Sequence, residues 1–165
     1  LGHHLPQLRF LQVLLGSERA LDDATRLHQR LLAGDVEEAI ELALRHLVDT
    51  VLDSDLEKLP PHVRQKVGER LQTAIKKNPA LDANHYATLT GYLEYADLRE
   101  LQDTIANKAN WLLFESRFGT RELLAKRFDQ LAELRNSIRH SRTVDEVTRK
   151  EGEAALVWFQ QVLGL

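Results

Sequence analysis

Apolar residues recur every three or four positions through most of the chain, and this spacing limits the fold more than any other feature. One stripe includes Ile40, Leu44 and Val48, and a second includes Val63 and Val67. This period corresponds to one face of an α-helix, and no stretch shows the strict alternation of a half-buried strand. The sequence therefore predicts an all-α fold, an up-and-down helical bundle with additional N-terminal helices.

Glycines and short polar residues predict the helix ends in the first third of the chain. A short helix is expected to end at Gly16 and a second one at Gly34, because glycine favours the C-terminal end of a helix. Asp35 with Glu38 has the spacing of a capping box, and Ser54 with Glu57 repeats it. We therefore expect new helices to begin at residues 35 and 54.

Prolines and further caps predict the later boundaries. Pro60 and Pro61 open a helix that Asn78 and Pro79 close. The next apolar stripe, residues 89–105, is expected to break near Gly91 or Asp97.

Two hydroxyl side chains predict the starts of the last two helices. Thr120 is placed to cap the helix that begins after Gly119, and Thr143 with Glu146 forms a capping box. The final helix is expected to turn these residues inward: Val147, Ala154, Ala155, Trp158 and Val162.

Aromatic residues are distributed unevenly along the chain. Phe10 is the only one among the first 85 residues, and the other nine lie between Tyr86 and Phe159. Because large rings bury large areas, we expect the principal core in the C-terminal half. The predicted organisation is an N-terminal helical extension, residues 1–80, followed by a helical bundle, residues 81–165.

Composition excludes several classes of function. The chain has no cysteine, which excludes disulfides, thiolate catalysis and cysteine-based zinc sites. Its net charge of −3 does not suit a protein that coats nucleic acid by bulk charge. No apolar run is long enough to cross a bilayer, and no signal peptide is visible, so a cytoplasmic location is expected. The lack of methionine, even at position 1, predicts a piece of a longer protein with other domains.

One arginine lies on an apolar helix face near the end of the chain. Leu124, Phe128, Leu131 and Ile138 form a helical stripe, and Arg135 falls within it. A charge in an apolar seam is strongly disfavoured without a partner. Either a carboxylate meets Arg135, or the seam opens into a cleft where an anion can bind.

His140 is the second notable residue of this segment. On a continued helix it would lie roughly 140° from Arg135. For the two to act together, the helix must end near residues 137–140, or the partners must come from two chains. The purely structural alternative pairs Arg135 with Glu115 or Glu133 and leaves His140 at a helix end, where the helix dipole favours it.

The segment from Arg135 to His140, Arg-Asn-Ser-Ile-Arg-His, matches the R-x(4–6)-H signature of the HEPN superfamily. The segment of residues 111–119 and the closing run Val-Trp-Phe-Gln-Gln-Val-Leu extend the match, which covers roughly residues 84–163. The chain resembles the HEPN branch of transcript-surveillance endoribonucleases and bacterial defence proteins. The resemblance implies an RNA-cleaving homodimer without a metal or other cofactor, in which Arg135, Asn136 and His140 are catalytic.

The chemistry of the residues agrees with this implication. Histidine suits proton transfer near neutral pH, and the arginine fork suits a phosphate. One His140 per chain is too few for a separate acid and base, whereas a two-fold dimer would supply two. Arg139 and Arg142 add positive charge next to Arg135 and His140, and they are candidates for binding RNA phosphates. Arg142 also stands where a related HEPN branch has a tyrosine modified by a nucleotidyltransferase, which argues against that partnership.

Two alternatives remain open. The chain could be a non-catalytic HEPN module that dimerises, or that binds nucleotide or RNA, within a larger protein. His46 and Asp49 share one helix face and could contribute to a metal site, but alone this is a weak signal. Four aromatic residues could stack on bases, but their helical spacing is more typical of a core: Tyr92, Tyr95, Trp111 and Trp158.

Overall fold

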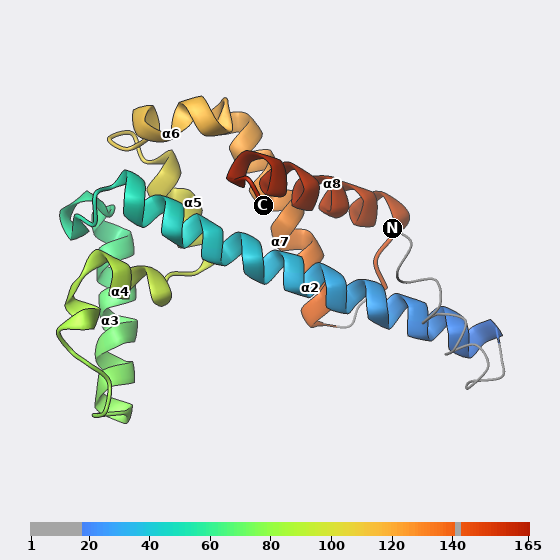
Figure 1. The fold of residues 1–165 in the computed structure, drawn as a ribbon, viewed down its shortest axis with the longest axis horizontal. Coiled ribbons are helices and arrows are strands. Elements are labelled where there is room, and N and C mark those ends of the chain that lie inside the picture. The colour runs from blue at the N-terminus through green and yellow to red at the C-terminus, as the bar shows by residue number, and fades with distance from the viewer. Residues whose placement is uncertain (1–17, 141–142) are drawn as a thin grey trace.

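The computed structural model describes the backbone of residues 18–140 and 143–165, and the side chains from residue 34 onward within these ranges. Within these residues all regular structure is helical and no strand occurs, which confirms the all-α prediction (Figure 1). Two short 3₁₀ helices occupy Leu56–Lys58 and His85–Ala87. The α-helices are α2 (Glu18–Val51), α3 (Pro61–Lys77), α4 (Leu89–Glu94), α5 (Leu98–Ala106), α6 (Trp111–Phe118), α7 (Arg121–Arg139) and α8 (Glu146–Leu163).

Helix α2 runs without a break through Gly34, so the predicted helix end at Gly34 and the new start at Asp35 are wrong. Glycine inside a helix costs only about 1 kcal/mol relative to alanine. The stripe that follows, which includes Ile40 and Leu44, is fully buried and holds the helix in place. Packing therefore outweighs the local preference. The helix predicted before Gly16 lies outside the described residues.

Several other boundaries are confirmed. Helix α3 begins at Pro61 and ends at Lys77, just before Asn78. The stripe of residues 89–105 breaks ahead of Asp97, which forms a capping box with Glu100 at the start of α5. Thr120 caps α7 by accepting a hydrogen bond of 3.1 Å from the backbone N–H of Leu123.

Two predicted caps are shifted along the chain. Asp55 rather than Ser54 caps the first 3₁₀ helix, and Ser54 itself has a left-handed backbone with φ of 53°. Asp145 rather than Thr143 caps α8, because its carboxylate accepts from the N–H of Thr148 at 3.0 Å and from its hydroxyl at 2.7 Å. A carboxylate one turn before a threonine satisfies two donors at once.

The orientation of α8 also differs in part from the prediction. Val147 and Ala154 were expected inside but are exposed. Ala155 and Phe159 are fully buried, while Trp158 and Val162 are half-buried. The inward face of α8 is therefore centred on Ala155 and Phe159, four residues apart.

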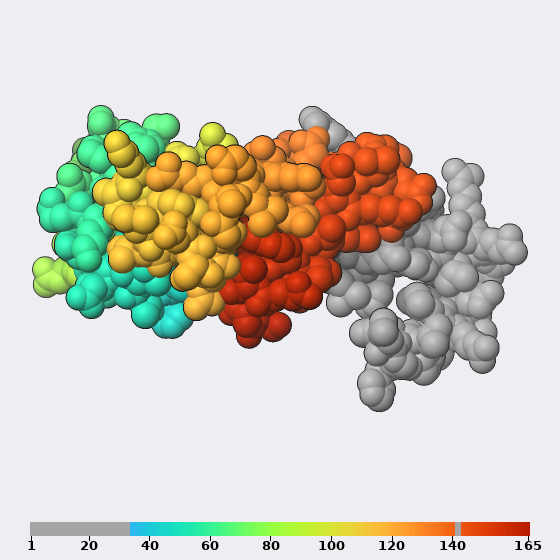
Figure 2. Space-filling model, turned by 90° about the horizontal axis from the view of Figure 1, so that it is seen from above, coloured from blue at the N-terminus to red at the C-terminus, as the bar shows by residue number. Residues whose placement is uncertain are grey.

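Helix α2 is the longest helix and runs along the length of the molecule (Figure 1). Helices α4, α5, α7 and α8 pack against α2, whereas α3 packs on α4 and α5, and α6 packs on α5 and α7. Helix α3 runs at a steep angle to α2 near the C-terminal end of α2 (Figure 1). Helices α6 and α8 share one face (Figure 2), where an Nη1 hydrogen of Arg117 is donated to the carbonyl of Val162 at 2.9 Å.

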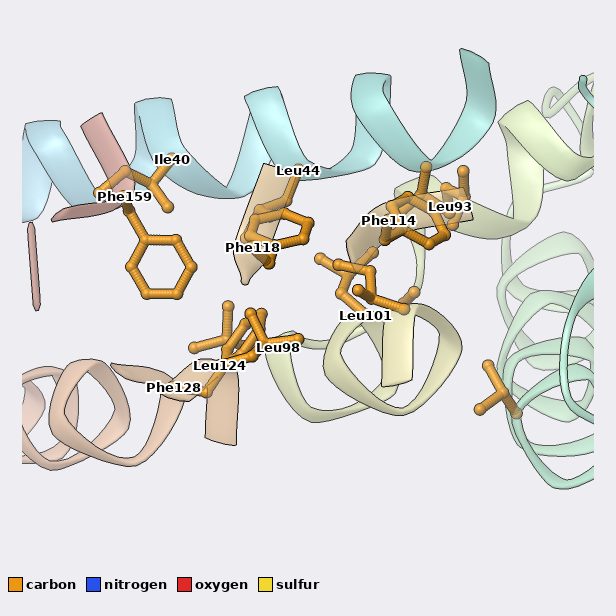
Figure 3. Packing of buried hydrophobic residues seen from close by; sticks show 14 of the residues in the cluster. Ile40, Leu44, Leu93, Leu98, Leu101, Phe114, Phe118, Leu124, Phe128 and Phe159 are labelled. Carbon is orange, nitrogen blue, oxygen red and sulfur yellow. The ribbon is translucent and has the colours of Figure 1, made fainter. Parts of the chain in front are cut away.

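A single buried cluster connects these helices. Ile40 and Leu44 of α2 point toward other members of the cluster, which include Leu101 of α5, Phe118 of α6, Phe128 of α7 and Phe159 of α8 (Figure 3). The cluster also includes side chains of α3. It therefore extends across residue 80, the position predicted to separate an extension from a bundle, and the core is not confined to the C-terminal half.

Candidate functional site

Helix α7 ends within the arginine–histidine segment. Arg139 is its last residue, and His140 follows as the C-cap, with its backbone N–H donated to the carbonyl of Asn136 at 3.0 Å. The end falls within residues 137–140, but the helix runs through Arg139, so His140 is still turned away from Arg135, and a second chain would have to bring the two together. Asn136, Arg139 and His140 are exposed, and Arg142 lies outside the described residues.

Arg135 has a different environment from the rest of its segment. Its side chain is only 19% exposed, and its guanidinium lies 2.8 Å from Glu37 and 3.1 Å from Glu41 of α2. A carboxylate therefore meets Arg135, as one of the two sequence alternatives required. The sequence analysis named Glu115 and Glu133 for that role, but both are exposed. The true partners were missed because the sequence alone did not place α2 beside α7.

These contacts are close without being well aligned. Nε of Arg135 and Oε1 of Glu41 are buried, yet neither makes a hydrogen bond of good geometry, so both distances describe ion contacts. Arg45 adds a second cation, 3.5 Å from Glu41, and donates to the carbonyl of Ala96 at 3.2 Å. The seam between α2 and α7 therefore holds two carboxylates and two guanidiniums.

Burial and repulsion both act on Glu37. Removal from water raises the pKa of this carboxyl above its usual value, and the nearby charge of Glu41 raises it further. The guanidiniums of Arg135 and Arg139 oppose both effects without cancelling them. Glu37 is thus a carboxylate held in its charged form less firmly than an exposed glutamate.

Arg135 also reaches a pocket of about 300 Å³ between α5 and α7. Asn136 and Arg139 extend its wall along α7, while Arg99 and Gln102 contribute from α5. The seam therefore opens into a cleft as well, which was the second sequence alternative. The structure brings Arg135, Asn136 and Arg139 together around one pocket, whereas His140, the next residue along the chain, does not line it.

The sequence reasoning missed the partners of Arg135. Glu37, Glu41 and Arg45 recur at intervals of four and share one face of α2, next to the buried stripe. Three charges in this spacing beside an apolar face could have indicated a polar seam. Arg99 and Gln102 carried no comparable signal, because only the packing of α5 on α7 gives them a role.

Most of the other residues that the sequence suggested for binding bases or a metal make contacts that stabilise the fold. Trp111 is buried and Trp158 is half-buried against the core, in agreement with the core interpretation. Asp49 accepts hydrogen bonds from the hydroxyls of Ser54 and Thr90. In the described part of the chain, no three histidine or carboxylate side chains gather as metal ligands do. None of its helices is long and apolar enough to cross a membrane.

Similarity to known proteins adds nothing to this geometry: no family model, no curated protein and no solved structure matches the chain.

Proposed function

We propose that the chain is a HEPN-like module that cleaves RNA without a metal ion, in a defence or RNA-surveillance role, when two copies face each other. One observation carries this proposal. The last turn of α7 presents Asn136, Arg139 and His140 to solvent beside a pocket whose wall includes Arg135. Donors, a cation and a proton carrier thus lie at one helix end.

The carboxylates beside Arg135 support a positioning role for its charge. Glu37 and Glu41 hold the guanidinium between α2 and the pocket. A cation fixed in advance stabilises developing negative charge better than one that must first be ordered. In this proposal Arg135 neutralises the phosphorane formed as RNA is cleaved.

The attacking group would be the 2′-hydroxyl of the substrate itself, which DNA lacks. One His140 accepts the hydroxyl proton, and the His140 of a second copy donates a proton to the leaving 5′ oxygen. The products are a 2′,3′-cyclic phosphate and a free 5′-hydroxyl. Arg139 and Arg142 would hold neighbouring phosphates, and Asn136 would orient the reacting phosphate or His140.

A second candidate function rests on the same ion cluster. Glu37 and Glu41 largely neutralise Arg135 within one chain, and the whole chain is acidic, with a net charge of −3. Both features favour a non-catalytic HEPN-like module that dimerises, or that binds RNA or nucleotide, for a larger protein.

Cleavage of labelled RNA in EDTA tests the first candidate. Wild type is compared with His140→Ala and with His46→Ala, a matched control that removes an exposed histidine from α2. We expect His140→Ala to lower the rate by about 10²–10⁴-fold, the usual contribution of general acid–base catalysis, and His46→Ala to leave it unchanged. Cleavage that requires added Mg²⁺, or equal rates for both variants, would contradict the mechanism.

Light scattering tests the assembly. A particle of twice the chain mass at micromolar concentration is the expected result, because one chain offers only one histidine at the motif. A monomer that still cleaves RNA at a rate linear in protein concentration would refute the two-copy site. A dimer that binds RNA without cutting it would favour the non-catalytic module.

A further inference from the structure

The pocket between α5 and α7 has opposite charges at its two ends, a feature that the cleavage mechanism does not require. Asp129, Ala132, Asn136 and Arg139 follow one another at spacings of three, four and three residues, so they form one stripe on α7. Ala132 lies in the middle of this stripe. Its short side chain leaves room between the polar ends.

The two ends of the stripe carry opposite charges. Asp129 and Arg139 are ten residues apart, about 15 Å along the helix axis. Both side chains are exposed, and within the described residues neither makes an ion pair or a side-chain hydrogen bond. Two other charged wall residues are engaged, because Asp97 caps α5 and Arg99 lies 3.6 Å from Asp103.

This arrangement suits a nucleotide better than a simple anion. A pocket of about 300 Å³ is near the lower limit for a small-molecule site. The cleaved phosphate would lie at the Arg139 end of the pocket, where Arg135 and Asn136 also line the wall, so in this inference Arg139 contacts the cleaved phosphate as well as a neighbouring one. The base would then extend along the stripe, past Asn136, toward Asp129.

The carboxylate selects among the bases. An ionised carboxylate only accepts hydrogen bonds. Guanine offers two adjacent donors, N1–H and the N2 amino group, to its two oxygens. Adenine and cytosine place an acceptor nitrogen next to their amino group, and uracil flanks its single N–H with two carbonyls, so each would meet Asp129 with at least one repulsive contact.

We propose that this pocket binds the nucleotide on the 5′ side of the cleaved bond and reads its base as guanine, with Asp129 as the specificity-determining residue. The inference rests on the proposed ribonuclease function for the identity of the substrate. Gln102 of α5 supplies an amide on the opposite wall, where it can contact the base edge.

Calorimetric titration with the four nucleoside 3′-monophosphates tests this inference without any cleavage. We expect guanosine 3′-monophosphate to bind about 10- to 100-fold more tightly than the others, the range that one bidentate base contact usually gives. Asp129→Asn replaces one acceptor oxygen by a donor and should abolish this preference. Because Asp129 is exposed, that variant should fold normally.

A space-filling variant locates the site. Ala132→Leu should abolish binding of guanosine 3′-monophosphate, and Ala154→Leu, which adds the same atoms to an exposed position of α8, should not change it. Equal affinity for all four nucleotides, no binding, or unchanged binding by Ala132→Leu would overturn the inference.

Mapping the cut sites separates this inference from the proposed function. Wild type that cuts after guanosine, together with an Asp129→Asn variant that has lost this preference, supports both. Guanosine 3′-monophosphate bound selectively by a protein that cuts no RNA refutes the ribonuclease alone. Cleavage without base preference, with no nucleotide preference in the titration, refutes the pocket assignment alone.

Discussion

Two arginines lie between helices beside glutamates of low exposure, and they differ in how completely they are paired. Arg70 of α3 meets a single acid, Glu100 of α5, with contacts of 2.8 and 3.4 Å, and also donates to the carbonyl of Tyr95. Arg135 of α7 meets two acids, which lie one turn apart on α2. Arg45, which lies 3.5 Å from Glu41, balances the charge of this second cluster, but some of its buried polar atoms make no hydrogen bond.

The difference separates a structural contact from a candidate functional one. Glu100 is used twice, because it also accepts the backbone N–H of Asp97 in the capping box of α5. Arg135 has less complete hydrogen bonding and lies on a pocket. An ion cluster whose polar atoms lack some hydrogen bonds, and which lies beside a pocket, can bind an external anion. A pair whose hydrogen bonds are all made offers an anion no free donor.

The largest expected effect comes from removing Arg135. Arg135→Ala leaves two poorly exposed carboxylates beside each other, so we expect the free energy of unfolding to fall by about 3 kcal/mol. Urea denaturation measures the change. A loss below about 1 kcal/mol would show that water already solvates Glu37 and Glu41 in the folded state.

A double variant keeps this stability effect apart from function. Glu37→Gln with Arg135→Gln removes one charge of each sign, leaves Glu41 paired with Arg45, and should recover most of the lost stability. If Arg135 acts on the substrate, RNA cleavage stays lost in this variant. Recovery of both stability and cleavage would reduce Arg135 to a structural role.

Removing Arg70 should have a smaller effect. Its side chain is 42% exposed, and Glu100 keeps its contact with the N–H of Asp97. We expect Arg70→Ala to lower the free energy of unfolding by about 1–2 kcal/mol, because one buried acceptor loses its charged donor. The same urea titration provides the measurement, and a loss equal to that of Arg135→Ala would remove the contrast between the two sites.

Glu37→Gln should change mainly how stability depends on pH. Since the folded protein raises the pKa of Glu37 above 4.5, its folded state holds this proton more tightly than the unfolded chain. This contribution to stability is complete below pH 4.5 and disappears as the pH rises through the folded pKa. Thermal melting of both proteins between pH 4 and 8 should show wild type losing stability relative to Glu37→Gln over that range. The opposite slope would mean that attraction to Arg135 exceeds the effect of burial.

The smallest effect on stability is expected at Arg139. Its side chain is exposed, so Arg139→Ala should change the free energy of unfolding by less than about 0.5 kcal/mol. If Arg139 binds a phosphate, RNA affinity should fall, and the slope of log affinity against log salt should decrease by about one. Filter binding at several salt concentrations measures this slope. Arg149→Ala on α8, which removes an exposed arginine paired with Glu153, is the matched control.

The helical class and most helix ends followed from the sequence, because they depend on neighbours within one turn. Apolar spacing placed the stripe of α3, and the local cap Thr120 placed the start of α7, while Asp97 was one of two positions expected for the break before α5. The same local rule gave a wrong helix end at Gly34. There the burial of a long apolar stripe outweighs the low helix propensity of glycine, and the helix continues. Local preference decides an end only when no larger packing energy opposes it.

The sequence also required a partner for Arg135, since a lone charge in an apolar seam is unstable. It could not identify that partner, because Glu37 and Glu41 lie almost a hundred positions away along the chain. Only the packing of α2 against α7 brings them within 3.1 Å. The pocket likewise needs α5 beside α7. Helix periods and caps are properties of short stretches, whereas counter-ions and hollows arise from the tertiary structure, because they depend on surfaces that meet only after folding.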